Sequence, residues 1–371
     1  MDVPPSHLLA ARLAALRAAL AERRLDGLLV ESLPSIAYLT GFRGSAGLLL
    51  VTDRVRLVVD GRYVTVATAL AEGTGLFELV ALESGESYDE VLAGLLAGAG
   101  AVRLGIEDEV MSVRRHRGLL ERASREAAFP ELVATDGLVD RLRVVKDSWE
   151  LSRLREGGRR LSEVAKCILP RVLAGRLERE VAADIEDELR RAGFERPAFD
   201  TIVAGGPNAA LPHHRAGERR IAPGDLVILD FGGVFQGYCT DLSRTVIVPP
   251  ASPEASALVS HVAEAQRAAI RAAGPGVAPE AVDQAARDVL ERAGVGDRFT
   301  HGTGHGLGLE VHERPRISRA RPGHAEPRLE AGMVFTVEPG AYVPGWGGVR
   351  IEDDVLVTAE GREVLTGDGT E

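Results

Sequence analysis

Lysine and cysteine are scarce in this sequence of 371 residues. Only Lys146 and Lys166 are lysines, so nearly all of the positive charge is arginine. Acidic residues outnumber basic ones by 55 to 44, and the resulting net charge of −11 argues against nucleic acid or an anionic membrane as a partner. The two cysteines, Cys167 and Cys239, are too few for a disulfide framework and lack the CxxC spacing of a metal or redox site.

Long hydrophobic runs are also missing. Charges interrupt the first 24 residues every few positions, so they lack the apolar core of a signal peptide, and no stretch approaches the length of a membrane span. We therefore expect a cytoplasmic protein. The sequence has no P-loop, no GxSxG and no HExxH, and the glycines at 302, 304 and 306 lack the strand-then-helix context of a dinucleotide-binding loop.

The hydrophobic content of 45% over this length predicts two domains with substantial cores. Residues 1–139 alternate strand-like runs with helical patterns, which predicts an α/β domain with a partly parallel sheet. Its first helix, capped by Ser6 and ending before Gly27, carries an apolar stripe of leucines. The other expected elements are strands at 27–30, 47–52, 55–60 and 103–107, and helices at 62–71, 88–97 and 113–126.

Residues 140–371 form the second predicted domain, which makes the whole chain α/β (α+β) in class. Two hairpins separated by helices indicate two similar halves that face each other. The segment RPGHAEP, 321–327, predicts an exposed loop beside the site. Long helices are expected at 147–169, 177–192, 253–273 and 279–293.

The first hairpin brings two aspartates together. A strand-like apolar run from Leu226 ends on Asp230, and a second run after a glycine-rich turn carries Asp241. A hairpin centred between Phe235 and Gln236 would place the two acids opposite each other, with Cβ atoms roughly 5 Å apart. Two carboxylates about 4 Å apart repel by about 4 kcal/mol at an effective dielectric of 20, so the pair needs protons or a cation. A polar bend with two solvated aspartates is the alternative.

The same pattern returns near residue 345. A hairpin centred on Gly345 places Glu338 opposite Glu352. Between the two hairpins lies HGTGHGLGLEVH, residues 301–312, with three histidines and with glycines that permit a close approach of the backbone. Four carboxylates and an imidazole are suitable donors for two divalent ions. Carboxylates that bridge two metals about 3.5–4 Å apart are the basis of two-metal hydrolysis.

These residues resemble the ligand set of the pita-bread metallopeptidases. The motifs DFGGVFQGYCTDLSRT, HGTGHGLGLEVHERP, TVEPGAY and VRIEDD are similar to those of the prolidase and Xaa-Pro aminopeptidase branch. A weaker resemblance covers LPSIAYLTGFRGSAGLLLVT and LVVDGRY in the first half. The resemblance implies a creatinase-like N-terminal domain and a pita-bread catalytic domain, in which a mixed sheet with pseudo-twofold symmetry is backed by helices. The implied metal ligands are Asp230, Asp241, His305, Glu338 and Glu352.

The resemblance also implies how two divalent ions are held. Asp230 would bind one ion, His305 and Glu338 the other, and Asp241 and Glu352 would bridge them. Manganese or cobalt is favoured by four carboxylates and one imidazole, with zinc as a further possibility. A hydroxide between the metals would attack the peptide, and Glu338 would carry the proton to the leaving nitrogen.

Further residues match pocket positions of the family. His213, His301 and His312 would line the pocket and stabilise the tetrahedral intermediate, whereas a structural role is the alternative for each. Tyr342 and Arg350 match positions near the prolyl pocket and the metal ligands, and Arg350 could equally orient the acids. His214 has no family counterpart.

The expected activity is hydrolysis of the bond between an N-terminal residue and proline. The short second hairpin favours an Xaa-Pro dipeptidase (prolidase), and an Xaa-Pro aminopeptidase acting on longer peptides is the alternative. A dipeptidase must bind the substrate carboxylate, for which Arg316 is the first candidate and Arg314 and Arg43 are others, although all three could be solvated surface residues. A creatinase-type or non-metal relative is a remote alternative, and methionine aminopeptidases normally lack so large an N-terminal domain. The resemblance further implies a homodimer.

Overall fold

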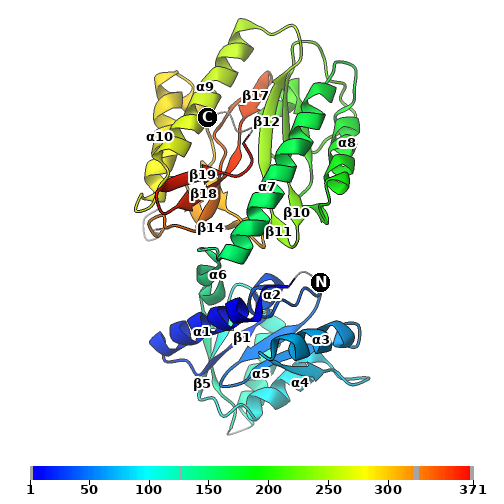
Figure 1. Cartoon of the computed structure of the whole chain (residues 1–371), viewed down its shortest axis with the longest axis vertical. Helices are drawn as coiled ribbons and strands as arrows, with labels where there is room; N and C mark the ends of the chain where they lie inside the picture. The colour runs from blue at the N-terminus through cyan, green and yellow to red at the C-terminus, as the bar shows by residue number, and fades with distance from the viewer. Residues whose placement is uncertain (1–2, 126–127, 321–325, 368–371) are drawn as a thin grey trace. The chain divides into compact units, whose positions relative to one another are not determined.

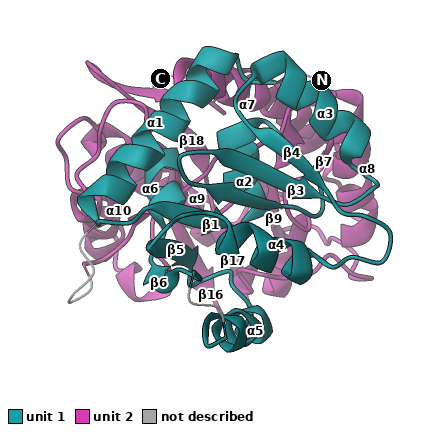
Figure 2. Cartoon of the chain, turned by 90° about the horizontal axis from the view of Figure 1, so that it is seen from below, with its two compact units in different colours: residues 1–143 teal, residues 144–371 magenta. Residues whose placement is uncertain are grey.

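The computed structural model describes residues 3–125, 128–320 and 326–367. The chain divides into two compact units, Met1–Arg143 and Val144–Glu371 (Figure 2). The boundary predicted near residue 140 falls inside helix α6 (Leu138–Arg143). Most of the predicted loop at 321–327 lies outside the described residues. Among the described helices, none is both long and apolar enough to cross a membrane.

The first unit contains a six-stranded sheet in the order β4-β3-β2-β1-β5-β6. The pairs β3–β4, β1–β5 and β5–β6 are parallel and the others antiparallel, which confirms the predicted partly parallel sheet. One detail is wrong: Ser6 is the first residue of α1 rather than its cap, because Pro5, with φ −52°, occupies the capping position. The elements are α1 (Ser6–Glu22), β1 (Gly27–Val30), α2 (Leu33–Thr40), β2 (Leu48–Val51), β3 (Val55–Val59), α3 (Val64–Thr74), β4 (Glu78–Ala81), α4 (Tyr88–Ala97), β5 (Arg103–Glu107), α5 (Val113–Ala123), β6 (Glu131–Thr135) and α6.

The second unit is built from two halves. Its first half contains α7 (Ser148–Ile168), η1 (Leu169–Arg171), α8 (Glu178–Arg191), β7 (Arg196–Pro197), β8 (Ile202–Gly205), η2 (Gly206–Ala210), β9 (Leu226–Phe231), β10 (Gly233–Phe235), β11 (Tyr238–Cys239) and β12 (Leu242–Ile247). Its second half contains α9 (Pro253–Ala272), α10 (Pro279–Arg292), η3 (Gly296–Arg298), β13 (Gly304–Gly306), β14 (Glu313–Ile317), β15 (Val334–Val337), β16 (Gly340–Val343), β17 (Gly347–Arg350), β18 (Asp353–Thr358) and β19 (Gly361–Val364).

The two halves repeat one arrangement. In each, a pair of helices precedes three strands that lie side by side, β8-β9-β12 in the first half and β13-β15-β18 in the second. Helices α7 and α8 lie together toward the right of the second unit in Figure 1, and α9 and α10 lie together toward its left. The predicted pair of similar halves is therefore present.

Each half has its own apolar core between helices and strands. In the first half, Leu161 and Ile185 of the helices pack in one buried cluster with Val227 and Leu229 of β9. The second half is covered in the same way by α9 and α10, whose apolar faces pack on β15 and β18. The strand ends that these cores fix in place carry the acidic residues.

The register of the first hairpin differs from the prediction. Phe235 pairs with Tyr238, so the turn is centred between Gln236 and Gly237 rather than one residue earlier. Both turn residues have positive φ, 49° and 87°, as the two-residue turns that suit hairpin twist require. As a result Asp230 lies opposite Ser243, and the predicted pairing of Asp230 with Asp241 is wrong.

The register of the second hairpin is confirmed. Val337 pairs with Asp353 and Gly340 with Arg350, which is the register of a hairpin centred on Gly345. Glu338 and Glu352 fall between these two pairs. They therefore face each other at the point where the paired strands change from β15–β18 to β16–β17.

Candidate metal centre

The acidic residues occupy matching places in the two halves. Asp230 lies near the end of β9 and Glu338 directly follows β15, the equivalent strand. Asp241 and Glu352 lie just before the equivalent strands β12 and β18. An isolated β-bridge between Ser243 and Glu352 joins the halves, so the acids of both halves meet at one place.

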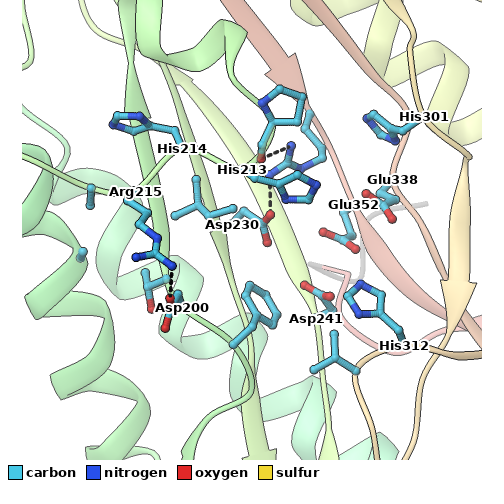
Figure 3. Close-up of a pocket in the computed structure, with 18 of the residues that line it drawn as sticks. Asp200, His213, His214, Arg215, Asp230, Asp241, His301, His312, Glu338 and Glu352 are labelled. Atoms are coloured by element: carbon cyan, nitrogen blue, oxygen red, sulfur yellow. Dashed lines mark hydrogen bonds and ion pairs between the residues drawn. The ribbon is translucent and has the colours of Figure 1, made fainter. Parts of the chain in front are cut away.

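The carboxylates point into a common space, together with one histidine. In Figure 3 the side chains of Asp230, Asp241, Glu338 and Glu352 converge. His305 of β13 places its Nε2 atom 3.5 Å from Glu338 Oε1 and 4.0 Å from Asp241 Oδ2. One ligand atom from each of Asp241, His305 and Glu352 lies within 4.8 Å of the others, a spacing that one metal ion can span.

The electrostatics of this cluster call for a cation. Burial, and next the charge of Glu352, raises the pKa of Asp241 well above its usual value. Burial and the neighbouring Glu338 raise the pKa of Glu352 in the same way, and burial raises that of Glu338 to about 8. Among the described residues, Oδ1 of Asp230 and Oδ1 of Asp241 are buried without a hydrogen-bond partner. Such oxygens are costly to bury unless an ion satisfies them.

The contacts of His305 suit the tautomer of a metal ligand. Its Nδ1 lies 3.1 Å from the carbonyl oxygen of Gly306 and can donate to it, which leaves a lone pair on Nε2 directed toward the acids. Burial, and next the neighbouring His312, lowers the pKa of His305 to about 4, so the ring is neutral. The donor set therefore fits divalent metal ions.

The glycines around His305 allow strands to approach closely, as predicted, but the close partner is backbone. A Cβ on Gly304 would lie 1.8 Å from the carbonyl oxygen of Thr336, and a Cβ on Gly306 would lie 2.0 Å from that of Arg314. Strand β13 is therefore packed tightly between β15 and β14. This packing holds His305 beside the acids.

Arg350 connects several members of the site. Its Nη2 donates to Asp230, its Nε to Ser243 Oγ at 3.1 Å and its Nη1 to Tyr342 Oη at 2.9 Å. Ser243 Oγ in turn donates to Glu352 Oε2 at 2.7 Å. Although burial opposes the charge of Arg350, Asp230 and the other nearby acidic groups hold its pKa well above the usual value. Arg350 thus orients acidic ligands from both halves.

Tyr342 contacts His301 through a hydrogen bond. Its hydroxyl can donate to His301 Nε2 at 2.8 Å, while His301 Nδ1 can donate to the carbonyl oxygen of Gly302 at 2.8 Å. Burial lowers the pKa of His301 to about 4 and raises that of Tyr342 to about 12, so both groups are neutral. Among the described residues, those that line the cavity include His301 but not Tyr342.

A cavity of about 1070 Å³ opens over the acids. His213, His301 and His312 line it, and the His312 ring lies edge-on to the His305 ring at 4.3 Å between centroids. His214, the neighbour of His213, lies away from the acids (Figure 3). The cavity extends over α8 and the segments that follow it in the chain, where it is lined by Arg179, Ala182, Ala183, Glu186, Phe199, Asp200, Ile202 and Arg215.

The three candidate arginines for the substrate carboxylate lie in different surroundings. Arg316 of β14 pairs with His305 of β13, so the two side chains share one face of the sheet. The Nη1 atom of Arg314 lies 3.6 Å from Oε2 of Glu326, so the two side chains form an ion pair. Arg43 is an exposed residue of the first unit, and its part in substrate binding stays a prediction.

Three residues that hold the candidate ligands in place were not identified from the sequence. Asp354 Oδ2 accepts the backbone N–H of Asp241 at 3.1 Å, and Thr336 Oγ1 accepts that of His305 at 3.2 Å. Ser243 contacts Glu352, as described above. The alternation of side chains along β12, β15 and β18 could have placed Ser243, Thr336 and Asp354 near the candidate ligands. It could not have shown which groups on neighbouring strands they contact.

The chain is similar to known peptidases over nearly its whole length. Residues 152–359 match metallopeptidase family M24, and residues 12–145 match the creatinase/prolidase N-terminal domain. An Xaa-Pro dipeptidase from Pyrococcus horikoshii is 33% identical over 92% of this chain and 93% of its own. The structure of an Xaa-Pro dipeptidase from Bacillus anthracis has a TM-score of 0.89 at 36% identity, covering 98% of this chain and 99% of its own.

An X-Pro aminopeptidase from Thermotoga maritima is also similar in structure, with a TM-score of 0.83 at 32% identity over 96% of this chain and 97% of its own. The similarity thus extends both to proteins named as dipeptidases and to one named as an aminopeptidase. The predicted fold, with a creatinase-like domain before a pita-bread catalytic domain, is confirmed. The chain belongs to metallopeptidase family M24.

Proposed function

We propose that this chain is a dinuclear metallo-exopeptidase that hydrolyses the bond between the first residue and proline in Xaa-Pro dipeptides. The observation that carries the proposal is the convergence of four carboxylates and one neutral imidazole at a cavity lined by further histidines, among them His213, His301 and His312. The similarity to proteins named Xaa-Pro dipeptidase supports the choice of substrate.

In this proposal Asp230 would help to hold one metal ion, His305 and Glu338 would help to hold the other, and Asp241 and Glu352 would be shared between them. Manganese or cobalt suits this donor set, and zinc is the third choice. Bound ions would supply Lewis-acid chemistry and a nucleophile from water at neutral pH.

Glu338 is proposed to carry the proton to the leaving nitrogen. Its side chain keeps 18% exposure toward the cavity, compared with 7% for Asp241, so it is the more accessible acid. His213 and His312 are proposed to contact the peptide and to donate hydrogen bonds as charge develops on the carbonyl oxygen. His301, neutral and tied to Tyr342, is proposed to form the wall beside proline.

Arg316 is proposed to bind the free carboxylate of a dipeptide. Its position on the same face as His305 supports this role, because a substrate at the metals would then end near the guanidinium. A guanidinium can bind a carboxylate through two parallel hydrogen bonds.

The test compares kcat/KM for an Xaa-Pro dipeptide with that for the matching Xaa-Pro-Yaa tripeptide. We expect the dipeptide to be preferred and Arg316→Ala to remove the preference, while Arg314→Ala, on the same strand, retains it. Equal or better tripeptide cleavage by the wild type would overturn the dipeptidase assignment. A loss with Arg314→Ala instead would move the role to that residue.

An Xaa-Pro aminopeptidase is the second candidate, favoured by the size of the cavity. Its volume of about 1070 Å³ is at the upper end of the range that encloses drug-sized ligands. Residues beyond proline could be accommodated in such a space. The same comparison of substrates decides between the two.

A homodimer and a cytoplasmic location complete the proposal, as the sequence analysis predicts. The peptide substrate requires neither nucleic acid nor membrane.

A further inference from the structure

Two buried carboxylates outside the candidate metal centre contact chain segments that carry cavity residues. Glu178 begins α8 and has an exposed fraction of 0%, and Asp283 lies in α10 with 1%. A buried carboxylate is costly unless hydrogen bonds satisfy it. The partners of each therefore indicate what it holds in place.

Glu178 binds the loop that carries His213. Its Oε1 accepts the backbone N–H of Gly205 at 2.8 Å and Nδ2 of Asn208 at 2.9 Å. Its Oε2 lies 2.9 Å from Nε2 of His214 and accepts the N–H of Gly217 at 3.3 Å. These donors come from both sides of His213 along the chain, so one carboxylate fixes the loop before and after the pocket histidine.

Glu178 thus also contacts His214, the neighbour of His213. His214 turns toward Glu178 and away from the acids, whereas His213 lies nearer to the acids (Figure 3), and both histidines line the cavity. The loop that carries His213 is thus held by Glu178, which is not among the described residues that line the cavity.

Asp283 binds the segment that carries His301. Its Oδ1 accepts the backbone N–H of Thr303 at 3.1 Å and the Thr303 hydroxyl at 2.8 Å. Its Oδ2 accepts Nε of Arg287 at 2.7 Å, and Arg287 in turn donates to the carbonyl oxygens of His301 at 2.6 Å and Phe299 at 3.3 Å. Residues on both sides of His301 are again held by one buried acid.

The two acids occupy equivalent helices. Helix α8 precedes β8 and α10 precedes β13, and these strands take the same place in the two halves. In both halves, therefore, a buried acid on this helix binds the chain on either side of a histidine that lines the cavity. A purely local structural role would not account for this recurrence. We propose that Glu178 and Asp283 are positioning residues that hold His213 and His301, respectively, in their working orientation. The inference rests on the proposed function, since it assumes that these histidines face a substrate.

The expected effect is on turnover. Displacing a catalytic group by about 1 Å can lower the rate on the order of 10²-fold. Glu178→Gln keeps the shape of the side chain but replaces one carboxylate oxygen, an acceptor, with an NH₂ group. This donor would face N–H groups from which the oxygen now accepts hydrogen bonds. We therefore expect kcat to fall by roughly 10- to 100-fold, with KM nearly unchanged.

A double-mutant cycle tests whether Glu178 acts through His213. If it does, Glu178→Gln lowers kcat in the wild-type background but has little further effect in the His213→Ala background. Equal losses in both backgrounds would overturn the proposal for Glu178. Asp283→Asn with His301→Ala forms the corresponding cycle for the second half, with the same criteria.

Ile185→Ala is the matched control for stability. Ile185 is fully buried on the same helix, so its truncation should lower the melting temperature without changing kcat of the folded protein. If Ile185→Ala lowers kcat as much as Glu178→Gln does, loss of stability explains both effects and the positioning role is rejected.

A spectroscopic measurement separates this proposal from the proposed function. In zinc-loaded protein, the ring resonance of His213, assigned by its loss in His213→Ala, should shift or broaden in Glu178→Gln and stay unchanged in Ile185→Ala. An unchanged resonance in Glu178→Gln would overturn the inference. If the wild type hydrolyses no Xaa-Pro peptide, the proposed function fails, and the resonance still decides whether Glu178 positions His213.

Discussion

Metal removal should make the stability of the second unit depend on pH. Burial raises the pKa of Glu338 from 4.5 to about 8, and burial also raises the pKa values of Asp241 and Glu352. A carboxyl group with a raised pKa in the folded state stabilises the fold while it is protonated. This contribution is complete below pH 4.5 and is lost as the pH rises through about 8.

The histidines contribute with the opposite sign at lower pH. The pKa values of His301 and His305 fall from 6.5 to about 4, so burying them as neutral rings costs stability at acidic pH, and this cost disappears as the pH rises through 6.5. The interval from about pH 7 to pH 8.5 therefore isolates the carboxyl groups. At about 1.4 kcal/mol per pKa unit, Glu338 alone should lower the free energy of unfolding by about 1 kcal/mol across it.

Urea unfolding followed by tryptophan fluorescence measures this effect. Trp149 and Trp346 are the only tryptophans and both lie in the second unit, so the signal excludes the first unit, where burial raises the pKa of Glu107 to about 7. The chelated protein should become less stable over the interval. The metal-loaded protein should not, because binding displaces the protons.

Glu338→Gln is the control, since the amide does not titrate and the metal-free variant should show a smaller decrease. A metal-free stability that is constant or rises between about pH 7 and pH 8.5 would refute the reasoning. So would a decrease in Glu338→Gln equal to that of the wild type.

Three further predictions concern the site and the assembly. Asp241→Ala and Glu352→Ala should each abolish hydrolysis and reduce the bound metal while the circular dichroism spectrum is retained, and near-normal turnover at full metal content would contradict the ligand assignment. His213→Ala and His312→Ala should lower mainly kcat, by roughly 10²–10⁴-fold, whereas a change in KM alone would reduce both to binding contacts. Light scattering should give twice the chain mass of 39.5 kDa, and a stable monomer would contradict the homodimer.

The hairpins show what could be predicted from the sequence. Gly345 marks the tip of the second hairpin, and its positive φ of 79° agrees with that position. In the first hairpin Gln236, which gave no signal of a left-handed conformation, also adopts positive φ, and the register moved by one residue. Both acids still reach the site, because Asp230 and Asp241 lie at strand ends that the fold brings together.

The long helices were predictable, because their apolar stripes repeat over several turns. Helix α2, at Leu33–Thr40, was missed because five of its eight residues are buried and the other three are half-buried, so that it shows no polar face. The strands β4 and β6 lie at the sheet edges and are mostly half-exposed or exposed, so they too lack a clear apolar pattern.

Contacts across the fold were beyond the reach of the sequence. Glu178 and Asp283 look like ordinary surface acids near the start of amphipathic helices, and only the folded chain shows what they bind. Arg350 illustrates the same point, because its contacts with Asp230, Ser243 and Tyr342 could be seen only in the folded chain.

The contact between Ser243 and Glu352 has a consequence for how the protein folds. It joins residues 109 positions apart, and it lies where the acids of the two halves meet. Contacts at such separation form slowly, because a long loop must be closed before they can stabilise anything. A folding intermediate with one half complete would present only two of the four carboxylates and could not hold a pair of ions. Tight metal uptake should therefore coincide with the docking of the halves, so that the rate of metal capture during refolding reports the last step of assembly.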